Sequence, residues 1–259
     1  MSENDFTTNE MMTVAAARLL ENGTVCFVGI GLPSQAANLA RLTHAPEVVL
    51  IYESGPIGTK PDVLPLSIGD GVLAESADTV VPTHEIFRYW LQGGHIDVGF
   101  LGAAQIDRFG NINTTVIGDY DHPKVRLPGA GGAPEIADQS GEVFVVMRHG
   151  LRSFVDKLDF LTSGGYLEGG DAREKRGIAG KGPTRVITDL CVLEPEAGSR
   201  ELVVTSIHPG VSREQIAEAT GWDVRFANDV TETAAPTAEE LRTLREFLAR
   251  TAEAHGDTA

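Results

Sequence analysis

The chain has 259 residues, of which 42% are hydrophobic, so it is long enough to bury a sizeable core in one large domain or two small ones. It contains 37 acidic and 21 basic residues, and its formal net charge is −16. A charge of this sign and size argues against nonspecific binding to nucleic acid or to an anionic membrane surface.

Two further features of the composition bear on the compartment. The only two cysteines, Cys26 and Cys191, lie in apolar surroundings and are expected to be free thiols in a reducing environment. The first ten residues are polar and acidic, unlike a signal peptide, and no stretch approaches the roughly 18 apolar residues of a membrane span. We therefore expect a cytoplasmic protein.

Helix and strand patterns alternate from the beginning of the chain. The spacing of Thr7 and Glu10 is that of a capping box, which predicts a helix ending near Gly23. An apolar run at 24–30, a helical pattern from Pro33 to about Leu42 and a second apolar run at 47–53 follow. Near-continuous apolar strands joined by a helix are typical of a parallel sheet covered on both faces.

The remaining elements continue this pattern. We predict a helix at 83–92, strands at 95–107, 141–149, 185–194 and 200–208, and helices at 211–220 and from Thr237 onward. The last two helices begin with the capping-box spacings of Ser212 and Gln215 and of Thr237 and Glu240. The glycine-rich and charged stretch 164–183 is interpreted as a long loop, because the strands on both sides need the same sheet. The predicted fold is an open, mostly parallel α/β sheet with helices on both faces, in a single domain that spans residues 1–259.

Two features near the N-terminus have more than one interpretation. Gly29 and Gly31 form a turn between a strand and a helix, and Glu53 lies 22 residues beyond Gly31 at the end of the next strand. This spacing resembles a dinucleotide-binding fingerprint, but Ser34 stands where the third glycine belongs. Alternatively Glu53 is a nucleophile, since a carboxylate at the carboxyl end of a strand projects toward the ligand crevice of an open sheet. A solvated loop acid is the third interpretation.

A second glycine-rich turn occupies residues 126–136, RLPGAGGAPEI, and follows a segment containing His122, Lys124 and Arg126. Consecutive backbone N–H groups in such a turn can hold an oxyanion or a phosphate, and the basic residues would supply a local positive patch. A tight turn flanked by exposed cations explains the same residues equally well.

Seven stretches in this order resemble the β subunit of family I coenzyme A transferases. They are FTTNEMM, NGTVCFVGIGLP, YESG, FLGAAQIDRFGNINTT, IGDYDHPKVRLPGAGGAPEI, VDKLDFLTSGG and HPGVSREQIAEATGWDV. Together they extend over nearly the whole chain. The ESG after a hydrophobic strand is similar to the glutaconate transferase type of subunit, whereas the succinyl-CoA:acetoacetate type carries SENG. The resemblance implies the CoA-transferase fold.

The resemblance also implies a reaction. Glu53 would attack an acyl-CoA thioester to form a mixed anhydride, and the released CoA thiolate would then attack the glutamyl carbonyl to give an enzyme–CoA thioester. The implied donor is succinyl-CoA and the implied acceptor is a dicarboxylic 3-oxo acid, with 3-oxoadipate expected. Glutaconate, acetoacetate or hydrolysis of the thioester remain alternatives. The CoA thioester is a substrate, and no permanently bound cofactor and no metal are expected.

The resemblance assigns further residues to oxyanion stabilisation or CoA binding. They are Phe27, Gly29, Gly31, Gly131, Gly132, Gln105 and Lys157. The backbone N–H of Phe27 and that of Gly131 or Gly132 are the implied oxyanion donors. Lys157 is equally well a solvated charge, and Gln105 equally well satisfies a turn.

Finally, the resemblance implies a partner. An α subunit would supply most of the CoA-binding surface, in an α2β2 heterotetramer, and no nucleic acid or membrane partner is expected. A non-catalytic structural subunit is the alternative of a different class, against which the intact Glu53 and glycine loop argue.

Overall fold

The computed structural model describes residues 5–256, and the chain divides into two compact units. Within the described residues, unit 1 comprises 5–100 and 235–256, and unit 2 comprises 101–234. We describe each unit by itself. The expectation of a single domain stays a prediction.

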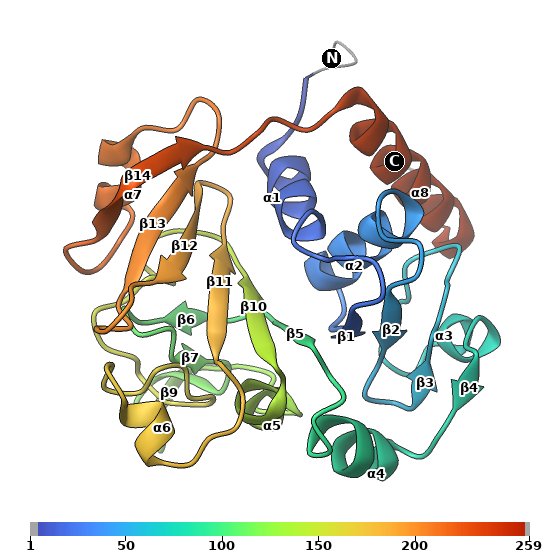
Figure 1. The fold of residues 1–259 in the computed structure, drawn as a ribbon, viewed down its shortest axis with the longest axis horizontal. Helices are drawn as coiled ribbons and strands as arrows, with labels where there is room; N and C mark the ends of the chain where they lie inside the picture. Colours follow the sequence, from blue (N-terminus) through green and yellow to red (C-terminus); the bar gives the residue numbers. More distant parts are fainter. Residues whose placement is uncertain (1–4, 257–259) are drawn as a thin grey trace. The chain divides into compact units, whose positions relative to one another are not determined.

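Unit 1 contains the first and the last of the described residues and is coloured blue to cyan and dark red in Figure 1. Its helices are α1 (Thr8–Ala17), α2 (Leu32–Leu42), α3 (Gly71–Glu75), α4 (Thr83–Glu85), the π-helical η1 (Ile86–Leu91) and α8 (Ala238–His255). Its strands are β1 (Val25–Phe27), β2 (Val49–Ile51), β3 (Pro56–Ile57), β4 (Thr79–Val80) and β5 (Val98–Leu101), whose last residue belongs to unit 2.

The strands of unit 1 follow the order β5-β1-β2-β3-β4. The central strand β1 is parallel to both neighbours, with Phe27 opposite Ile51 of β2 and Gly99 of β5. Strands β3 and β4 extend this arrangement in the antiparallel sense. Phe27 and Ile51 are buried, as expected of parallel strands covered on both faces.

Helices α1, α2 and α8 of unit 1 pack against one another. The capping boxes predicted at Thr7 and Thr237 are both formed, and each is completed by a glutamate three residues later. Both of these glutamates also pair with an arginine of the other helix. Arg18, which caps the C-terminus of α1, contacts Glu240 at 2.6 Å, and Arg245 of α8 contacts Glu10 at 2.6 Å. The two capping boxes therefore also join the ends of the chain.

Unit 2 contains the remaining elements. Its strands are β6 (Gln105–Ile106), β7 (Ile112–Asn113), β8 (Val116–Gly118), β9 (Pro123–Arg126), β10 (Glu142–Val146), β11 (Pro183–Ile187), β12 (Cys191–Pro195), β13 (Leu202–Ile207) and β14 (Arg225–Glu232). Its helices are α5 (Ala133–Gln139), α6 (Ala172–Lys175) and α7 (Arg213–Glu218).

The larger sheet of unit 2 has the strand order β14-β13-β12-β11-β10. The pairs β10–β11 and β13–β14 are parallel, whereas β11–β12 and β12–β13 are antiparallel. Two small antiparallel pairs, β6–β7 and β8–β9, lie outside it. The capping box predicted at Ser212 is formed at the start of α7.

The prediction of one strand at 185–194 is wrong, because this stretch forms the antiparallel strands β11 and β12. The hydroxyl of Thr188 accepts hydrogen bonds from the N–H groups of Leu190 (3.1 Å) and Cys191 (3.0 Å). A threonine that bonds its own backbone in this way offers a turn in place of a continued ladder. Because the residues before and after this turn are apolar, the sequence pattern was interpreted as one continuous strand.

The glycine-rich stretch 164–183 is anchored by the buried Arg173. Its guanidinium donates hydrogen bonds to four backbone carbonyls, those of Gly180 (2.7 Å), Gly164 (3.2 Å), Gly165 (2.9 Å) and Ala137 (2.6 Å). Burial lowers the pKa of Arg173 from its ordinary value, and the nearby Asp138 opposes this shift. The stretch is a folded loop that contains α6, as the interpretation as a loop requires.

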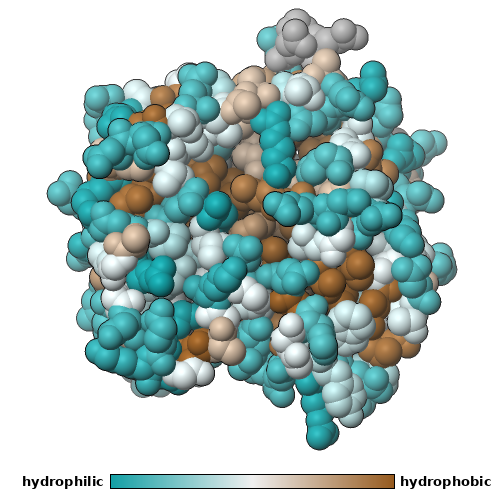
Figure 2. Space-filling model, viewed as in Figure 1, coloured by the Kyte–Doolittle hydropathy of each residue, from teal (hydrophilic) through white to brown (hydrophobic). Residues whose placement is uncertain are grey.

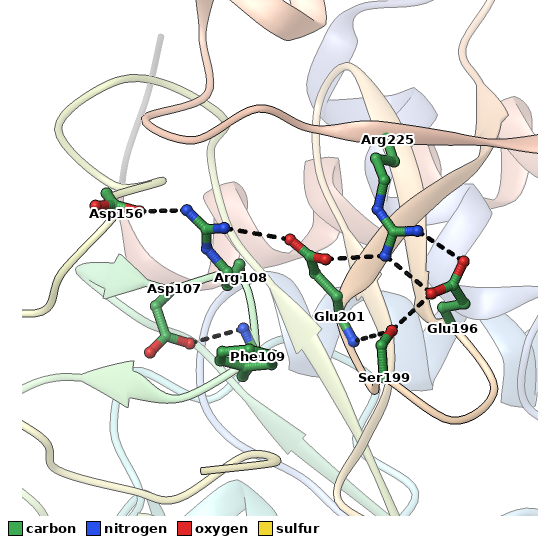
Figure 3. A network of polar contacts seen from close by, with 8 residues as sticks. All are labelled: Asp107, Arg108, Phe109, Asp156, Glu196, Ser199, Glu201 and Arg225. Atoms are coloured by element: carbon green, nitrogen blue, oxygen red, sulfur yellow. Dashed lines mark hydrogen bonds and ion pairs between the residues drawn. The ribbon is translucent and has the colours of Figure 1, made fainter. Parts of the chain in front are cut away.

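A chain of ion pairs joins four segments of unit 2 (Figure 3). Arg108 pairs with Asp156 and reaches Glu201 at 3.5 Å, and Glu201 pairs with Arg225 at 2.9 Å. Arg225 also binds both carboxylate oxygens of Glu196, at 2.8 and 2.9 Å. Charges of alternating sign at these distances support one another more than isolated surface pairs do.

The expected class, an open and mostly parallel α/β sheet with helices, is confirmed, and the sheet is mixed because antiparallel strands adjoin the parallel ones. Hydrophilic side chains cover most of the face seen in Figure 2. None of the helices within residues 5–256 is long and apolar enough to cross a membrane.

Candidate active site

Glu53 lies in a tight turn between β2 and β3, two residues beyond the end of β2. The turn is closed by two backbone hydrogen bonds, from the Gly55 N–H to the Tyr52 carbonyl (3.0 Å) and from the Tyr52 N–H to the Pro56 carbonyl (3.1 Å). The Glu53 side chain is half-buried and has no hydrogen-bond or ion-pair partner within residues 5–256. The carboxylate is thus held on a rigid turn and is free to meet a ligand.

Gly55 gives this turn its rigidity. Its φ is +124°, and a Cβ atom there would lie 1.9 Å from the carbonyl oxygen of Val81. The Val81 N–H in turn donates to the Gly55 carbonyl at 3.1 Å. At Gly58, where φ is +67°, a Cβ atom would lie 2.2 Å from a carboxylate oxygen of Asp78. Contacts within unit 1 therefore give a structural reason for both glycines.

A buried polar cluster lies directly behind the turn. The hydroxyls of Tyr52 and Ser34 are 2.8 Å apart, and the Asn38 amide donates to the Ser34 carbonyl at 2.9 Å. All three side chains are fully buried. Burial raises the pKa of Tyr52 to about 12, so its phenol is neutral and acts as a hydrogen-bonding group. Sequence reasoning missed this cluster, although Ser34 and Asn38 interrupt an otherwise apolar helix face at a spacing of four.

The glycine turn at 29–31 leads into α2. Gly31 caps this helix with a φ of +81°, which favours glycine, and Pro33 stands in the first turn as expected. The N–H groups of Gly29 and Gly31 have no acceptor in the part of the chain that the structure describes. Phe27 is placed differently, because strands flank it on both sides and direct its backbone groups toward β2 and β5. In this loop of unit 1, the backbone N–H groups without an acceptor among the described residues therefore include those of Gly29 and Gly31, which come after Phe27 in the chain.

The second glycine turn, in unit 2, is open. Gly131 has a φ of +49°, and no atom lies within 4 Å of the place its Cβ would occupy. Gly132 caps α5, and the N–H groups of Gly131 and Gly132 have no acceptor among the described residues. The turn is held from behind by Thr114, whose hydroxyl donates to the Gly129 carbonyl at 2.8 Å. This geometry can present two adjacent N–H groups to an anion.

Gln105 and Lys157, also in unit 2, differ in their surroundings. Gln105 is 5% exposed; its carbonyl oxygen accepts from Asn113 (2.8 Å) and from the Asp159 N–H (3.1 Å), and its amide donates to the Asp159 carboxylate (3.0 Å). Its polar side chain is therefore part of a buried hydrogen-bond network. Lys157 is exposed and forms no ion pair with the described residues.

Comparison with known proteins places the chain in a family. A family model for coenzyme A transferase matches residues 9–219. The chain therefore belongs to the coenzyme A transferase family, and the resemblance seen in the sequence is confirmed.

Three relatives define its place in that family. The chain is 73% identical to the B subunit of 3-oxoadipate CoA-transferase from Pseudomonas knackmussii over 251 residues, which cover 97% of this chain and 96% of the relative. It matches the crystal structure of glutaconate coenzyme A-transferase from Acidaminococcus fermentans with a TM-score of 0.88 at 34% identity, covering 95% of each chain. It is also 30% identical to the cholesterol ring-cleaving hydrolase IpdB subunit of Rhodococcus jostii, over 84% of this chain and 81% of the relative. The CoA-transferase fold expected from the sequence is thereby confirmed.

Proposed function

We propose that this chain is the β subunit of an enzyme that moves CoA from succinyl-CoA to 3-oxoadipate, with Glu53 as the covalent nucleophile. The observation that carries the choice of reaction and acceptor is the 73% identity to a 3-oxoadipate CoA-transferase subunit over nearly the full length of both chains. The rigid turn that holds a half-buried Glu53 without an internal partner supports its role as the nucleophile.

The reaction consists of two exchanges of the same kind. A carboxylate oxygen of Glu53 attacks the thioester carbonyl of succinyl-CoA and expels CoA thiolate, which leaves a mixed anhydride. The thiolate attacks the Glu53 carbonyl carbon, succinate departs with one glutamyl oxygen, and Glu53 becomes a CoA thioester. The carboxylate of 3-oxoadipate then attacks this thioester, and the thiolate released takes the new acyl group. Glu53 is regenerated without consumption of water.

These steps explain why the nucleophile should lie on a rigid turn that leaves its carboxyl group accessible. Glu53 is attacked at its carbonyl carbon and also attacks through its oxygen, so substrates must approach the carboxyl group from more than one direction. Each step develops negative charge on a carbonyl oxygen, which backbone N–H groups can stabilise. We propose the N–H groups of Gly29 and Gly31, which lie in the same unit as Glu53, and, as the resemblance implies, those of Gly131 and Gly132 for this purpose. Phe27, the other donor that the resemblance implies, is less suited because its backbone groups face β2 and β5.

Hydrolysis of a CoA thioester, the alternative that the sequence leaves open, is the second candidate function. One relative at 30% identity is named a cholesterol ring-cleaving hydrolase subunit. The same enzyme–CoA thioester would then be attacked by water instead of an acceptor acid. The much higher identity to a transferase subunit favours transfer.

This proposal includes a second kind of polypeptide as partner. The 73% identical relative is named as a B subunit, which supports an α-type partner that contributes to the CoA site and an α2β2 assembly in the cytoplasm. Gln105 and Lys157 are proposed as contributors to the pocket and to CoA binding. No tightly bound cofactor is required, because the CoA thioester itself is the substrate.

The distal carboxylate of 3-oxoadipate needs a cation. The candidate cations are Lys60, Arg88, Lys124 and Arg126. Lys60 is paired with Asp78 at 3.0 Å, and Arg88 lies over the ring of Tyr89. Arg126 lies over the ring of Tyr120 and donates to its carbonyl oxygen. Lys124 is exposed and has no ion-pair partner among the residues described. We propose Lys124 as the most available of these cations.

The test uses the chain co-purified with its partner subunit, supplied with succinyl-CoA and candidate acids in water enriched in oxygen-18. Transfer predicts that succinate beyond one equivalent per Glu53 forms only with the correct acceptor. This succinate should carry no solvent oxygen, because water takes no part. A hydrolase would release labelled succinate without any acceptor. A preference for glutaconate or acetoacetate over 3-oxoadipate would keep the mechanism and change the substrate.

A further inference from the structure

The buried cluster behind Glu53 joins two parts of the proposed site in unit 1. Tyr52 immediately precedes Glu53, and Ser34 lies in the first turn of α2, three residues after Gly31. The 2.8 Å contact between their hydroxyls is therefore a direct link between the turn that carries the nucleophile and the helix that follows the glycine turn.

This link is itself braced. Asn38 donates to the Ser34 carbonyl at 2.9 Å, and its own side-chain oxygen accepts from Arg41 at 3.1 Å. Arg41 in turn donates to the carbonyl of Pro61 at 2.7 Å, and Pro61 lies in the segment that follows β3. The chain of contacts thus starts at the residue before Glu53 and returns to the segment after β3.

Fully buried polar side chains are unusual in a helix face packed on a strand, since apolar residues of the same size would fill the space without needing partners. A phenylalanine would pack in place of Tyr52, and an alanine in place of Ser34. What the hydroxyl pair adds is a fixed distance and direction between β2 and α2, because a hydrogen bond is directional and apolar packing is not.

We propose that Tyr52 and Ser34 are positioning residues for the Glu53 carboxylate, acting through their shared hydrogen bond. This inference rests on the proposed function of Glu53. The bond fixes the carboxylate relative to the N–H groups of Gly29 and Gly31, so that attack on the thioester and stabilisation of the oxyanion occur in one geometry. Displacement of a reacting group by about 1 Å can reduce the rate about 100-fold.

The experiment measures how fast the co-purified complex acquires CoA on Glu53 after mixing with succinyl-CoA, by rapid quenching and mass spectrometry. We expect Tyr52→Phe to slow this step by about 10- to 100-fold, with little change in the KM for succinyl-CoA. Ser34→Ala should have a similar effect. The double variant should be no slower than the slower single variant, because both changes break the same bond.

A matched control separates positioning from general loss of structure. Tyr166→Phe removes another buried tyrosine hydroxyl, which donates to the Pro183 carbonyl at 3.3 Å in unit 2. It should lower thermal stability to a similar extent and leave the rate of CoA attachment within about 2-fold. The Ser34→Ala variant keeps the test decisive if Tyr52→Phe fails to assemble with its partner.

The outcomes distinguish the two levels of the proposal. A wild-type complex that never carries CoA on Glu53 would overturn the proposed function, and the positioning role with it. A wild-type complex that forms the adduct while both single variants form it at the wild-type rate would overturn the positioning role alone. Strictly additive losses in the double variant would also overturn it, because the two hydroxyls would then act independently.

Discussion

Replacing Gly55 by alanine tests whether the close approach of Val81, the residue after β4, fixes the turn that carries Glu53. The new Cβ would lie 1.9 Å from the Val81 carbonyl oxygen, and the backbone there has a φ of +124°. The conformational strain is about 1–2 kcal/mol. Forcing the two chains apart adds about 1–3 kcal/mol, together with about 1 kcal/mol for weakening the Val81–Gly55 hydrogen bond.

Gly23 provides the matched control for this change. Its φ is +83°, but no atom lies within 4 Å of the place its Cβ would occupy, so Gly23→Ala carries the conformational strain without the clash. The two variants should therefore differ by about 2–4 kcal/mol in the free energy of unfolding. For units of this size that corresponds to a difference in Tm on the order of 10 °C.

The assay is thermal denaturation of both variants in complex with the partner subunit, alongside their transferase kcat. Gly55→Ala should melt well below Gly23→Ala and lose activity even at temperatures where it stays folded, because its turn moves Glu53. Gly23→Ala should keep its kcat. Equal melting temperatures, or full activity in Gly55→Ala, would refute the reasoning that the contact with Val81 sets the position of the turn.

Three further predictions concern unit 2. Burial lowers the pKa of His149 from 6.5 to about 4, so the unfolded chain binds more protons than the folded chain between these pH values. The contribution of His149 to the free energy of unfolding should be complete above pH 6.5 and fall by up to about 3 kcal/mol toward pH 4. His149→Gln should flatten this dependence in denaturation experiments across that range. Arg173→Leu removes the donor from four backbone carbonyls, three of them in buried hydrogen bonds, and should cost at least about 3 kcal/mol and expose residues 164–183 to proteolysis. Arg176→Ala, which removes an exposed pair with Glu168, should cost no more than about 1 kcal/mol, and equal protease sensitivity in both arginine variants would contradict this account. Gly131→Val places a β-branched residue at a φ of +49° and should lower kcat at a small cost in stability; unchanged kinetics would remove this turn from the oxyanion site.

The sequence predicted the structure well where a pattern depends only on residues that are close together in the chain. The capping boxes at Thr7, Ser212 and Thr237 depend only on residues three apart, and all three are formed. The helix after the glycine turn was likewise predicted to within a residue at its start, because Gly31 and Pro33 mark it. Element boundaries that depend on a neighbour's hydrogen bonds were less predictable, as the turn at Thr188 shows.

The candidate site divides in the same way. The apolar run before Glu53 correctly predicted its place after a buried strand. The sequence did not predict the close contact between Gly55, in the turn that carries Glu53, and Val81. That contact joins segments 26 residues apart in sequence, so no local sequence pattern predicts it. The Tyr52–Ser34 bond and the carbonyls bound by Arg173 share this property, since each depends on which distant groups the fold brings together.

The most direct test of the central claim is intact and peptide mass spectrometry of this chain, co-purified with its partner and incubated with succinyl-CoA without acceptor. The account predicts a CoA-sized adduct on the peptide that contains Glu53, discharged by 3-oxoadipate and absent in Glu53→Gln, whose turnover falls by orders of magnitude while the complex still assembles. An adduct on another residue, or wild-type activity in Glu53→Gln, would contradict it.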